Sequence, residues 1–278
     1  TGATGFIGSH FVNNVHEAGH ELVCLRRLGS KPRIKLFKEP NWVEGSMEDN
    51  WNDALSRCDV FVHLASHSTN VPYDTLENCL YWNLNVSLQL LQQARDSGIE
   101  KFIIAGTCFE YGRSGEDYDF IPIDAPLKPT LSYPASKAAA SIVFNQWAIE
   151  HNLKLKYLRI FQVFGEGEDQ SRLWPSLRRA ALAGDDFNLT SGEQVRDFTP
   201  VEEIAKQLLR ELDFSTIKKG EPFLNHVSAG KPQTLKEFTE NWWKEWGAKG
   251  TLNFGKKVYR ENEVMRFVPL LKKTHHEQ

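Results

Sequence analysis

The stretch that decides the fold is the opening one, Thr1-Gly2-Ala3-Thr4-Gly5-Phe6-Ile7-Gly8. Its glycines permit a tight turn and let a pyrophosphate approach the backbone closely. An amphipathic pattern at residues 9–17 follows, and the N-terminus of such a helix offers unpaired N–H groups to phosphates. A tight turn without a ligand is the alternative, but a second strand pattern near Glu21 favours a dinucleotide site. The cofactor-binding residues predicted from this turn are Gly2, Gly5, Phe6, Ile7 and Gly8.

Outward from the turn, apolar runs alternate with amphipathic stretches through the first half of the chain. This alternation predicts right-handed crossovers and a mostly parallel sheet covered on both faces, a Rossmann-like, doubly wound α/β fold. Past Phe161 the rhythm breaks, which indicates a smaller C-terminal lobe. Because a central strand should precede the glycine turn, we expect the sequence to lack that first strand. Strands are predicted at 21–25, 60–64, 102–105 and 155–160, and helices at 9–17, 75–96 and 135–150.

Composition excludes several classes of protein. The 278 residues carry a net charge of −3, whereas nucleic-acid-binding proteins usually have a basic surplus. The sequence contains no run of 18 apolar residues, so no membrane span is predicted. The four cysteines form no CxxC pair, which favours reduced thiols in a cytoplasmic protein over a disulfide framework or a zinc site. We therefore expect no nucleic-acid partner, no membrane insertion and no metal.

The sharpest chemical signal is Tyr133-Pro134-Ala135-Ser136-Lys137. Four-residue spacing places Tyr133 and Lys137 on one helix face. A nearby ammonium is expected to lower the pKa of the phenol, so that Tyr133 exchanges a proton with a carbinol or carbonyl oxygen, while Lys137 also holds the nicotinamide ribose. Thr107, at the C-terminal end of the strand at 102–105, is expected to hydrogen-bond the same substrate oxygen. The alternative for Thr107 is a hydroxyl that only caps the turn.

The second and third predicted strands point to further cofactor contacts. Arg26 and Arg27 follow the second strand, where an acid would bind a ribose 2′-hydroxyl and arginine accommodates a 2′-phosphate. NADP(H) is therefore favoured over NAD(H), although two solvated arginines remain the alternative. Leu64 and Ala65 end the third strand at the edge where ligands bind in open parallel sheets.

Taken in order, the glycine turn, residues 59–66, Thr107 and Tyr133 with Lys137 resemble the extended short-chain dehydrogenase/reductase family of sugar-nucleotide epimerases, dehydratases and reductases. The resemblance implies a dinucleotide-binding domain over 1–160 and a sugar-nucleotide lobe over 161–278. It also implies a homodimer that associates through the helices at 75–96 and 135–150. The substrate-binding residues that it implies are Asn85, Gln162 and Arg196, the last of which has a structural pair with an acid as its alternative.

Within the family, residues 172–198 look most like 4-keto-sugar reductases such as CDP-abequose synthase and dTDP-6-deoxytalose dehydrogenase. The expected reaction is hydride transfer between the nicotinamide and C4 of a nucleotide-activated sugar, with Thr107, Tyr133 and Lys137 as catalytic residues. An epimerase and a non-catalytic dinucleotide-binding protein are the alternatives. A 4,6-dehydratase is not expected, because Cys108 and Phe109 stand where dehydratases of the family carry Asp and Glu.

Overall fold

The structure is a computed structural model that describes residues 1–261 and 263–271. The elements up to residue 160 are α1 (Phe6–Glu17), β1 (Val23–Arg26), β2 (Asn41–Glu44), α2 (Asn52–Leu55), β3 (Val60–His63), α3 (Leu76–Leu80), the π-helical turn η1 (Tyr81–Val86), α4 (Ser87–Asp96), β4 (Lys101–Thr107), the 3₁₀ turns η2 (Cys108–Tyr111) and η3 (Arg113–Asp117), α5 (Ser132–Glu150) and β5 (Lys154–Ile160). Those beyond it are β6 (Val163–Phe164), α6 (Leu173–Ala183), β7 (Phe187–Asn188), β8 (Val195–Asp197), β9 (Thr199–Pro200), α7 (Val201–Arg210), β10 (Phe223–Val227), β11 (Pro232–Thr234), α8 (Leu235–Glu245), β12 (Leu252–Asn253) and β13 (Arg266–Phe267).

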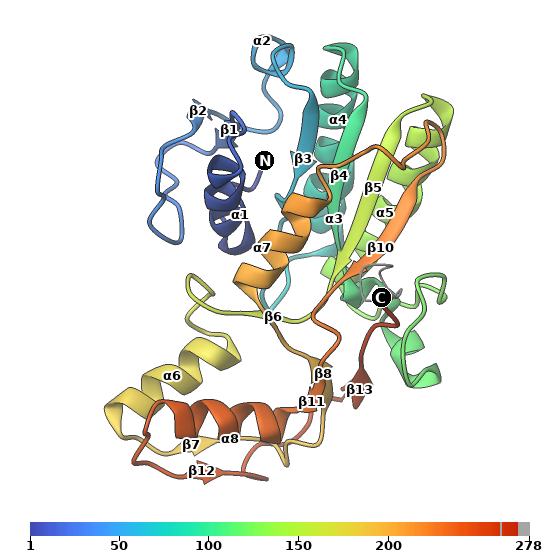
Figure 1. Cartoon of the computed structure of the whole chain (residues 1–278). Coiled ribbons are helices and arrows are strands. Elements are labelled where there is room, and N and C mark those ends of the chain that lie inside the picture. Colours follow the sequence, from blue (N-terminus) through green and yellow to red (C-terminus); the bar gives the residue numbers. More distant parts are fainter. Residues whose placement is uncertain (262, 272–278) are drawn as a thin grey trace, which may run out of the picture.

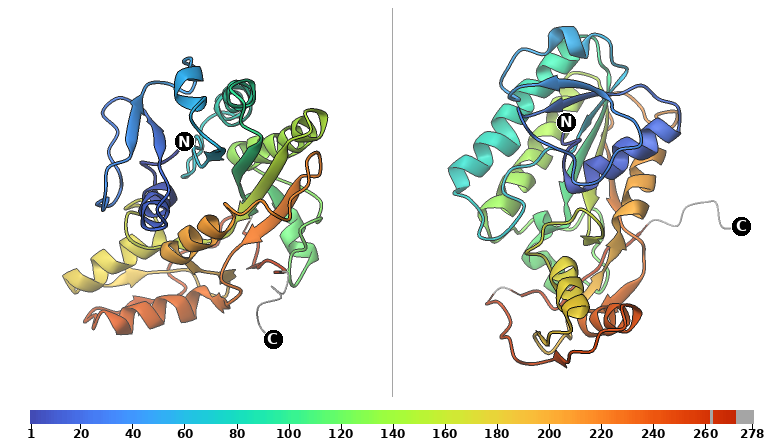
Figure 2. Two further views of the ribbon diagram at one scale, coloured as in Figure 1. Left: turned by 45° about the horizontal axis from the view of Figure 1, so that its top comes forward. Right: turned by 90° about the vertical axis from the view of Figure 1, so that its left-hand side faces the viewer.

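A parallel sheet in the order β10-β5-β4-β3 forms the centre of the molecule (Figure 1). Its side chains alternate between two apolar cores, as the pleat requires. Phe102 and Ile104 of β4 pack with α4 and α5 on one face, whereas Ile103 packs with α1 and α7 on the other. Figure 2 shows these helices on the two sides of the sheet. The expected α/β fold with a mostly parallel, doubly covered sheet is confirmed.

The strands β1 and β2 form a separate parallel pair. A cavity of 890 Å³, lined by apolar side chains of α1, β1, β2 and β3, lies between this pair and the main sheet. At its end the amino group of Thr1 donates to Val62 O at 2.8 Å, and Leu64 N donates to Thr1 O at 3.2 Å. These bonds fix the glycine turn beside the C-terminal end of β3. That a strand precedes Thr1 stays a prediction.

The second half of the chain builds a smaller lobe below the sheet and also returns to it. The lobe contains α6, α8 and short strands around an aromatic core that includes Phe164, Phe198 and Phe238. However, α7 packs on α1, and β10 pairs with β5 in parallel. The sheet layers therefore draw on residues from both sides of position 160, and the domain division there stays a prediction. Among the described residues, no helix is long and apolar enough to cross a membrane.

Candidate active site

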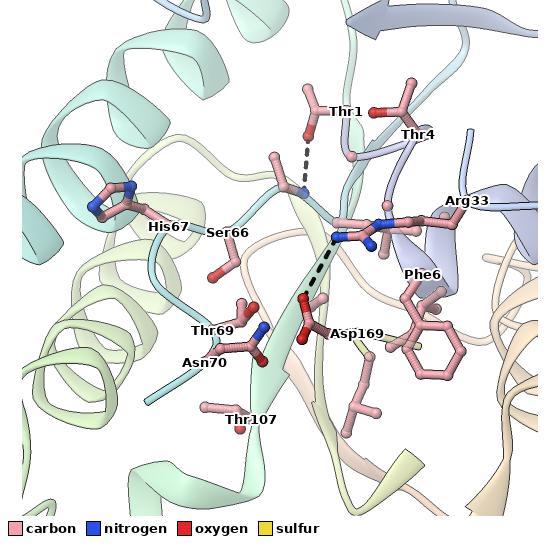
Figure 3. Close-up of a pocket in the computed structure, with 18 of the residues that line it drawn as sticks. Thr1, Thr4, Phe6, Arg33, Ser66, His67, Thr69, Asn70, Thr107 and Asp169 are labelled. Carbon is pink, nitrogen blue, oxygen red and sulfur yellow. Dashed lines mark hydrogen bonds and ion pairs between the residues drawn. The ribbon is translucent and has the colours of Figure 1, made fainter. Parts of the chain in front are cut away.

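A pocket of 890 Å³ opens where the C-terminal ends of β3, β4 and β5 meet the glycine turn (Figure 3). It gathers most of the residues that the sequence singles out, although they come from segments far apart in the chain. Two of the predicted residues, Asn85 and Arg196, do not line it. The predicted residues that line it are Gly2, Gly5, Phe6, Ile7, Gly8, Arg26, Arg27, Leu64, Ala65, Thr107, Tyr133, Lys137 and Gln162.

The glycine turn fits a dinucleotide diphosphate. Gly2 has a φ of +75°, and a Cβ there would lie 2.5 Å from the Leu64 carbonyl carbon, so the turn packs directly on the end of β3. Gly5 is the N-cap of α1 and supplies no side-chain hydrogen bond, and the first turn of the helix contains no acid. The first residues of α1, Phe6, Ile7 and Gly8, line the pocket, so the positive end of the helix dipole lies there, and no carboxylate of that turn offsets it.

Tyr133, Lys137 and Thr107 meet in this pocket from two elements. Tyr133 and Lys137 lie one turn apart in α5, and Thr107 ends β4; all three are buried. Tyr133 shares the pocket with Ser66 and Thr107, whose side chains act to lower the pKa of its phenol. Lys137 Nζ donates to Ala105 O at 2.8 Å, which anchors the ammonium to β4 just before Thr107. The arrangement places a phenol, a hydroxyl and an ammonium at one end of the cleft.

The electrostatics of this group differ from the sequence-based expectation. We expected Lys137 to lower the pKa of Tyr133, but burial raises it, and the side chains of Ser66 and Thr107 only partly oppose that rise. Burial also lowers the pKa of Lys137 to about 8. In this environment Tyr133 is protonated at neutral pH, which suits a proton donor.

Thr107 is held by an ion pair behind it. Glu110 is fully buried and accepts the Thr107 backbone N–H at 2.8 Å through Oε1, while Arg159 Nε donates to its Oε2 at 2.8 Å. Tyr157 OH also donates to Glu110 at 2.8 Å. Beside them, burial raises the pKa of the Cys108 thiol to about 12, so it is not a thiolate nucleophile at neutral pH. Glu110 therefore fixes the backbone of Thr107 and does not itself line the pocket.

Asn83 occupies the position predicted for Asn85. Asn85 is exposed, whereas Asn83 is buried, accepts His67 N at 2.7 Å and donates to Ser136 Oγ at 3.0 Å. The helical period explains the difference, because Asn83 shares its helix face with the buried Ser87, four residues on. The pairing with Asn83 ties the loop after β3 to α5 next to Tyr133.

Arg196 does not line the pocket, although it lies near Cys108. Its guanidinium pairs with Glu263 at 2.6 Å and donates to Val264 O at 2.7 Å. The neighbouring acid Asp197 has a different partner, because it accepts a hydrogen bond from Gly230 N at 2.6 Å. In this structure Arg196 thus has the structural pairing that was the alternative for it.

The two predicted arginines after β1 also differ from each other. Arg26 pairs with Glu44 on the neighbouring strand, with Nε and Oε1 2.8 Å apart, and lies over the Trp42 ring. Arg27 is exposed at the pocket, and the sequence analysis missed two further cations, Lys31 and Arg33, that line the same pocket. The missed cations lie several residues beyond the strand, and only the path of the loop brings them to the pocket.

Glu168 is an unusual carboxyl in the pocket wall. It is 8% exposed, and its Oε2 has no hydrogen-bond partner among the described residues. Burial raises its pKa to about 7, opposed by the charge of Arg172. The fold therefore favours the protonated acid.

This burial gives a testable pH dependence of stability. Because the pKa of Glu168 is higher in the folded state than in the unfolded state, the carboxyl contributes to the free energy of unfolding. This contribution is fully present below about pH 4.5 and is lost as pH rises through about 7. Glu168→Gln should remove this loss, and at pH 8 the variant should be more stable than the wild type by up to about 3 kcal/mol. Urea unfolding of both proteins at pH 5 and pH 8 measures the difference. A difference in unfolding free energy that does not change between the two pH values would contradict the assignment.

Comparison with known proteins agrees with this architecture. The NAD dependent epimerase/dehydratase family matches residues 1–224. A UDP-glucose 4-epimerase of Corynebacterium glutamicum is 26% identical over 86% of this chain and 77% of its own, and the dTDP-6-deoxy-L-talose 4-dehydrogenase (NAD(+)) of Aggregatibacter actinomycetemcomitans is 24% identical over 86% and 87%. The solved UDP-glucose 4-epimerase of Thermotoga maritima superposes with a TM-score of 0.84, at 23% identity over 98% of this chain and 89% of that one. With its glycine turn, parallel sheet and matching profile, this chain belongs to the NAD dependent epimerase/dehydratase family.

Proposed function

We propose that this protein is an NADP(H)-dependent oxidoreductase that reduces the C4 carbonyl of a nucleotide-activated 4-keto-6-deoxy sugar. The observation that carries the proposal is that Thr107, Tyr133 and Lys137 line one pocket with the glycine turn. A bound nicotinamide cofactor supplies the hydride. The similarity to a dTDP-6-deoxy-L-talose 4-dehydrogenase supports a reaction of this class.

The residues of the chain have distinct roles in the proposed reaction. Tyr133 donates its proton to the sugar oxygen as the carbonyl is reduced, and burial keeps the phenol protonated until then. Thr107 hydrogen-bonds the same oxygen from the end of β4. Lys137 places a positive charge beside Tyr133 and holds the cofactor ribose, and Gln162 offers its amide to the substrate.

The cofactor preference follows from the charges at the adenosine end. Arg27 and Lys31 line the pocket there, and no carboxylate of residues 25–47 does. Two cations match a 2′-phosphate, which NADPH has and NADH lacks.

The double variant Arg27→Ala/Lys31→Ala should therefore raise the Kd for NADPH by about 10-fold to 100-fold and that for NADH by about 2-fold or less. Cofactor fluorescence titration measures both. Arg26→Ala is the matched comparison, and its effect should be smaller because Glu44 already neutralises Arg26. Equal losses for both cofactors, or a wild-type preference for NADH, would contradict the proposal.

The site does not suit a 4,6-dehydratase. Loss of water from a hexose needs an acid to expel the C6 hydroxyl and a base to remove the C5 proton. Phe109 has no proton to exchange, and the Cys108 thiol is buried with a pKa of about 12. The nearby Glu110 is fully buried and paired with Arg159.

An epimerase is the second candidate, favoured by the similarity to UDP-glucose 4-epimerases. The two functions differ in stoichiometry, because a reductase consumes one NADPH per product and an epimerase leaves the bulk cofactor unchanged. The test supplies a nucleotide-linked hexose and, separately, its 4-keto-6-deoxy derivative, and follows NADPH absorbance and product mass. We expect NADPH to be consumed with the 4-keto-6-deoxy sugar and not with the hexose. Product without NADPH loss would support the epimerase, and loss of water from the hexose would support a dehydratase.

We further propose that the protein acts in the cytoplasm as a homodimer. The exposed apolar side chains of Ile142 and Ile149 on α5, and of Leu76 on α3, support pairing through these helices. Sedimentation equilibrium on the wild type and on Ile142→Lys/Ile149→Lys tests the dimer. A monomeric wild type would contradict it.

A further inference from the structure

Arg33 is a cation in the wall of the cofactor pocket that has no role in the proposed reaction. It lies in the loop after β1 and lines the pocket together with Thr4, Gly5 and Phe6. Its guanidinium points toward Asp169, in the loop between β6 and α6, with Nη2 and Oδ2 4.0 Å apart (Figure 3). Two loops from opposite halves of the chain therefore face each other over the pocket.

The contact between Arg33 and Asp169 is loose. At 4.0 Å the two groups are beyond hydrogen-bond distance, and their side chains are 50% and 34% exposed. Exposed pairs of this kind contribute little to stability. Moreover, Asp169 has partners of its own, because Ser171 donates to it through Oγ at 2.6 Å and through its backbone N at 3.0 Å. These bonds lower the pKa of Asp169, so the carboxylate remains satisfied if Arg33 leaves.

The first turn of α1, which forms part of the pocket wall, suits an anion. The first turn of α1 lines the pocket, has no acid and has a glycine in place of a side-chain cap. The loop that carries Asp169 is fixed to α1, because His10 Nε2 lies 2.9 Å from Glu166 O. The same loop packs on the base of Arg33, since a Cβ at Gly167 would lie 3.1 Å from the Arg33 Cβ. Arg33 thus lines the same pocket as the N-terminus of α1, and its guanidinium faces Asp169.

We propose that Arg33 is a ligand of the cofactor diphosphate, and that Asp169 holds its guanidinium until the cofactor replaces it. The inference rests on the proposed function, because it requires a dinucleotide on the glycine turn. A diphosphate offers charge-assisted hydrogen bonds at about 2.7–2.9 Å, which are stronger than the 4.0 Å contact with Asp169. Asp169 is therefore a competitor for Arg33 and weakens cofactor binding.

The competition predicts effects of opposite sign for the two partners. Arg33→Ala should raise the Kd for NADPH by about tenfold, because a charge-assisted bond is lost. Asp169→Asn should lower the Kd by about threefold, because the guanidinium is released. In the Arg33→Ala background, Asp169→Asn should have no further effect. Titration of NADPH fluorescence with the four proteins gives all the values without an activity assay.

Arg210→Ala and Glu203→Gln, which alter a surface pair at 3.6 Å on α7, are the matched controls and should leave the Kd unchanged. If both pocket variants weaken binding, the pair is a latch that holds the loops together, and the inference is wrong. If Asp169→Asn tightens binding equally with and without Arg33, the effect is general electrostatics and the inference is again wrong. No NADPH or NADH binding by the wild type would instead contradict the proposed function, together with the inference.

Discussion

Tyr133→Phe is expected to lower kcat by about 10² to 10⁴, the usual contribution of a positioned general acid. The substitution removes only the hydroxyl, and the ring keeps its packing against Tyr73, whose centroid lies 5.3 Å away. Burial keeps Tyr133 protonated, so the lost group is the proton donor of the proposed reduction. Steady-state kinetics with the keto sugar, together with the Kd for NADPH, measures the change.

The control for this prediction is Tyr81→Phe. Tyr81 is exposed on η1, outside the pocket, and hydrogen-bonds only Glu48 through its hydroxyl among the described residues. Its kcat should stay close to that of the wild type. Near-normal turnover by Tyr133→Phe would rule out the assigned proton donor, and an equal loss in both variants would point to a general effect on folding.

Arg159→Met is expected to lower the free energy of unfolding by about 3–5 kcal/mol. The substitution leaves the fully buried Glu110 carboxylate without its cationic partner, and an uncompensated buried charge is strongly destabilising. Arg159 also donates to Tyr111 OH at 2.9 Å and to Ile123 O at 2.8 Å, and these acceptors lose a partner too. Urea denaturation measures the loss.

The double variant Glu110→Gln/Arg159→Met separates charge from packing. It removes both charges, so it should regain much of the stability that Arg159→Met loses. Arg159 holds the Glu110 carboxylate, which also accepts the Thr107 N–H. Arg159→Met should therefore lower kcat as well. A loss of less than about 1 kcal/mol in Arg159→Met would show that the pair is solvated rather than buried.

The sequence predicts the sheet layers well where periodicity is strong. The strands at 60–64, 102–105 and 155–160 correspond to β3, β4 and β5, and the helix at 135–150 to α5. β10 was not predicted, because Phe223-Leu-Asn-His-Val carries two polar residues and lies far along the chain from its partner β5. Only the tertiary fold brings such an edge strand back to the sheet.

Among the site residues, those on one helix face could be predicted from the sequence, whereas those that depend on distant partners could not. Tyr133 and Lys137 were predictable because four-residue spacing fixes both on one helix face. Asn83 was within reach, since the buried stripe of its helix passes through it and not through Asn85. Glu263 and Val264, which pair with the Arg196 guanidinium, lie 67 and 68 residues away, and no local pattern marks them.

The central claim is that hydride moves between the nicotinamide and C4 of a nucleotide-linked sugar beside Tyr133. The most direct test incubates the protein with NADPH carrying deuterium at both C4 positions of the nicotinamide and with a nucleotide-linked 4-keto-6-deoxy hexose. Mass spectrometry and NMR then locate the label in the sugar. We predict one deuterium at C4 of the product sugar for each NADPH consumed, and about 10² to 10⁴ times slower labelling with Tyr133→Phe. A product that carries no deuterium at C4 would contradict the account.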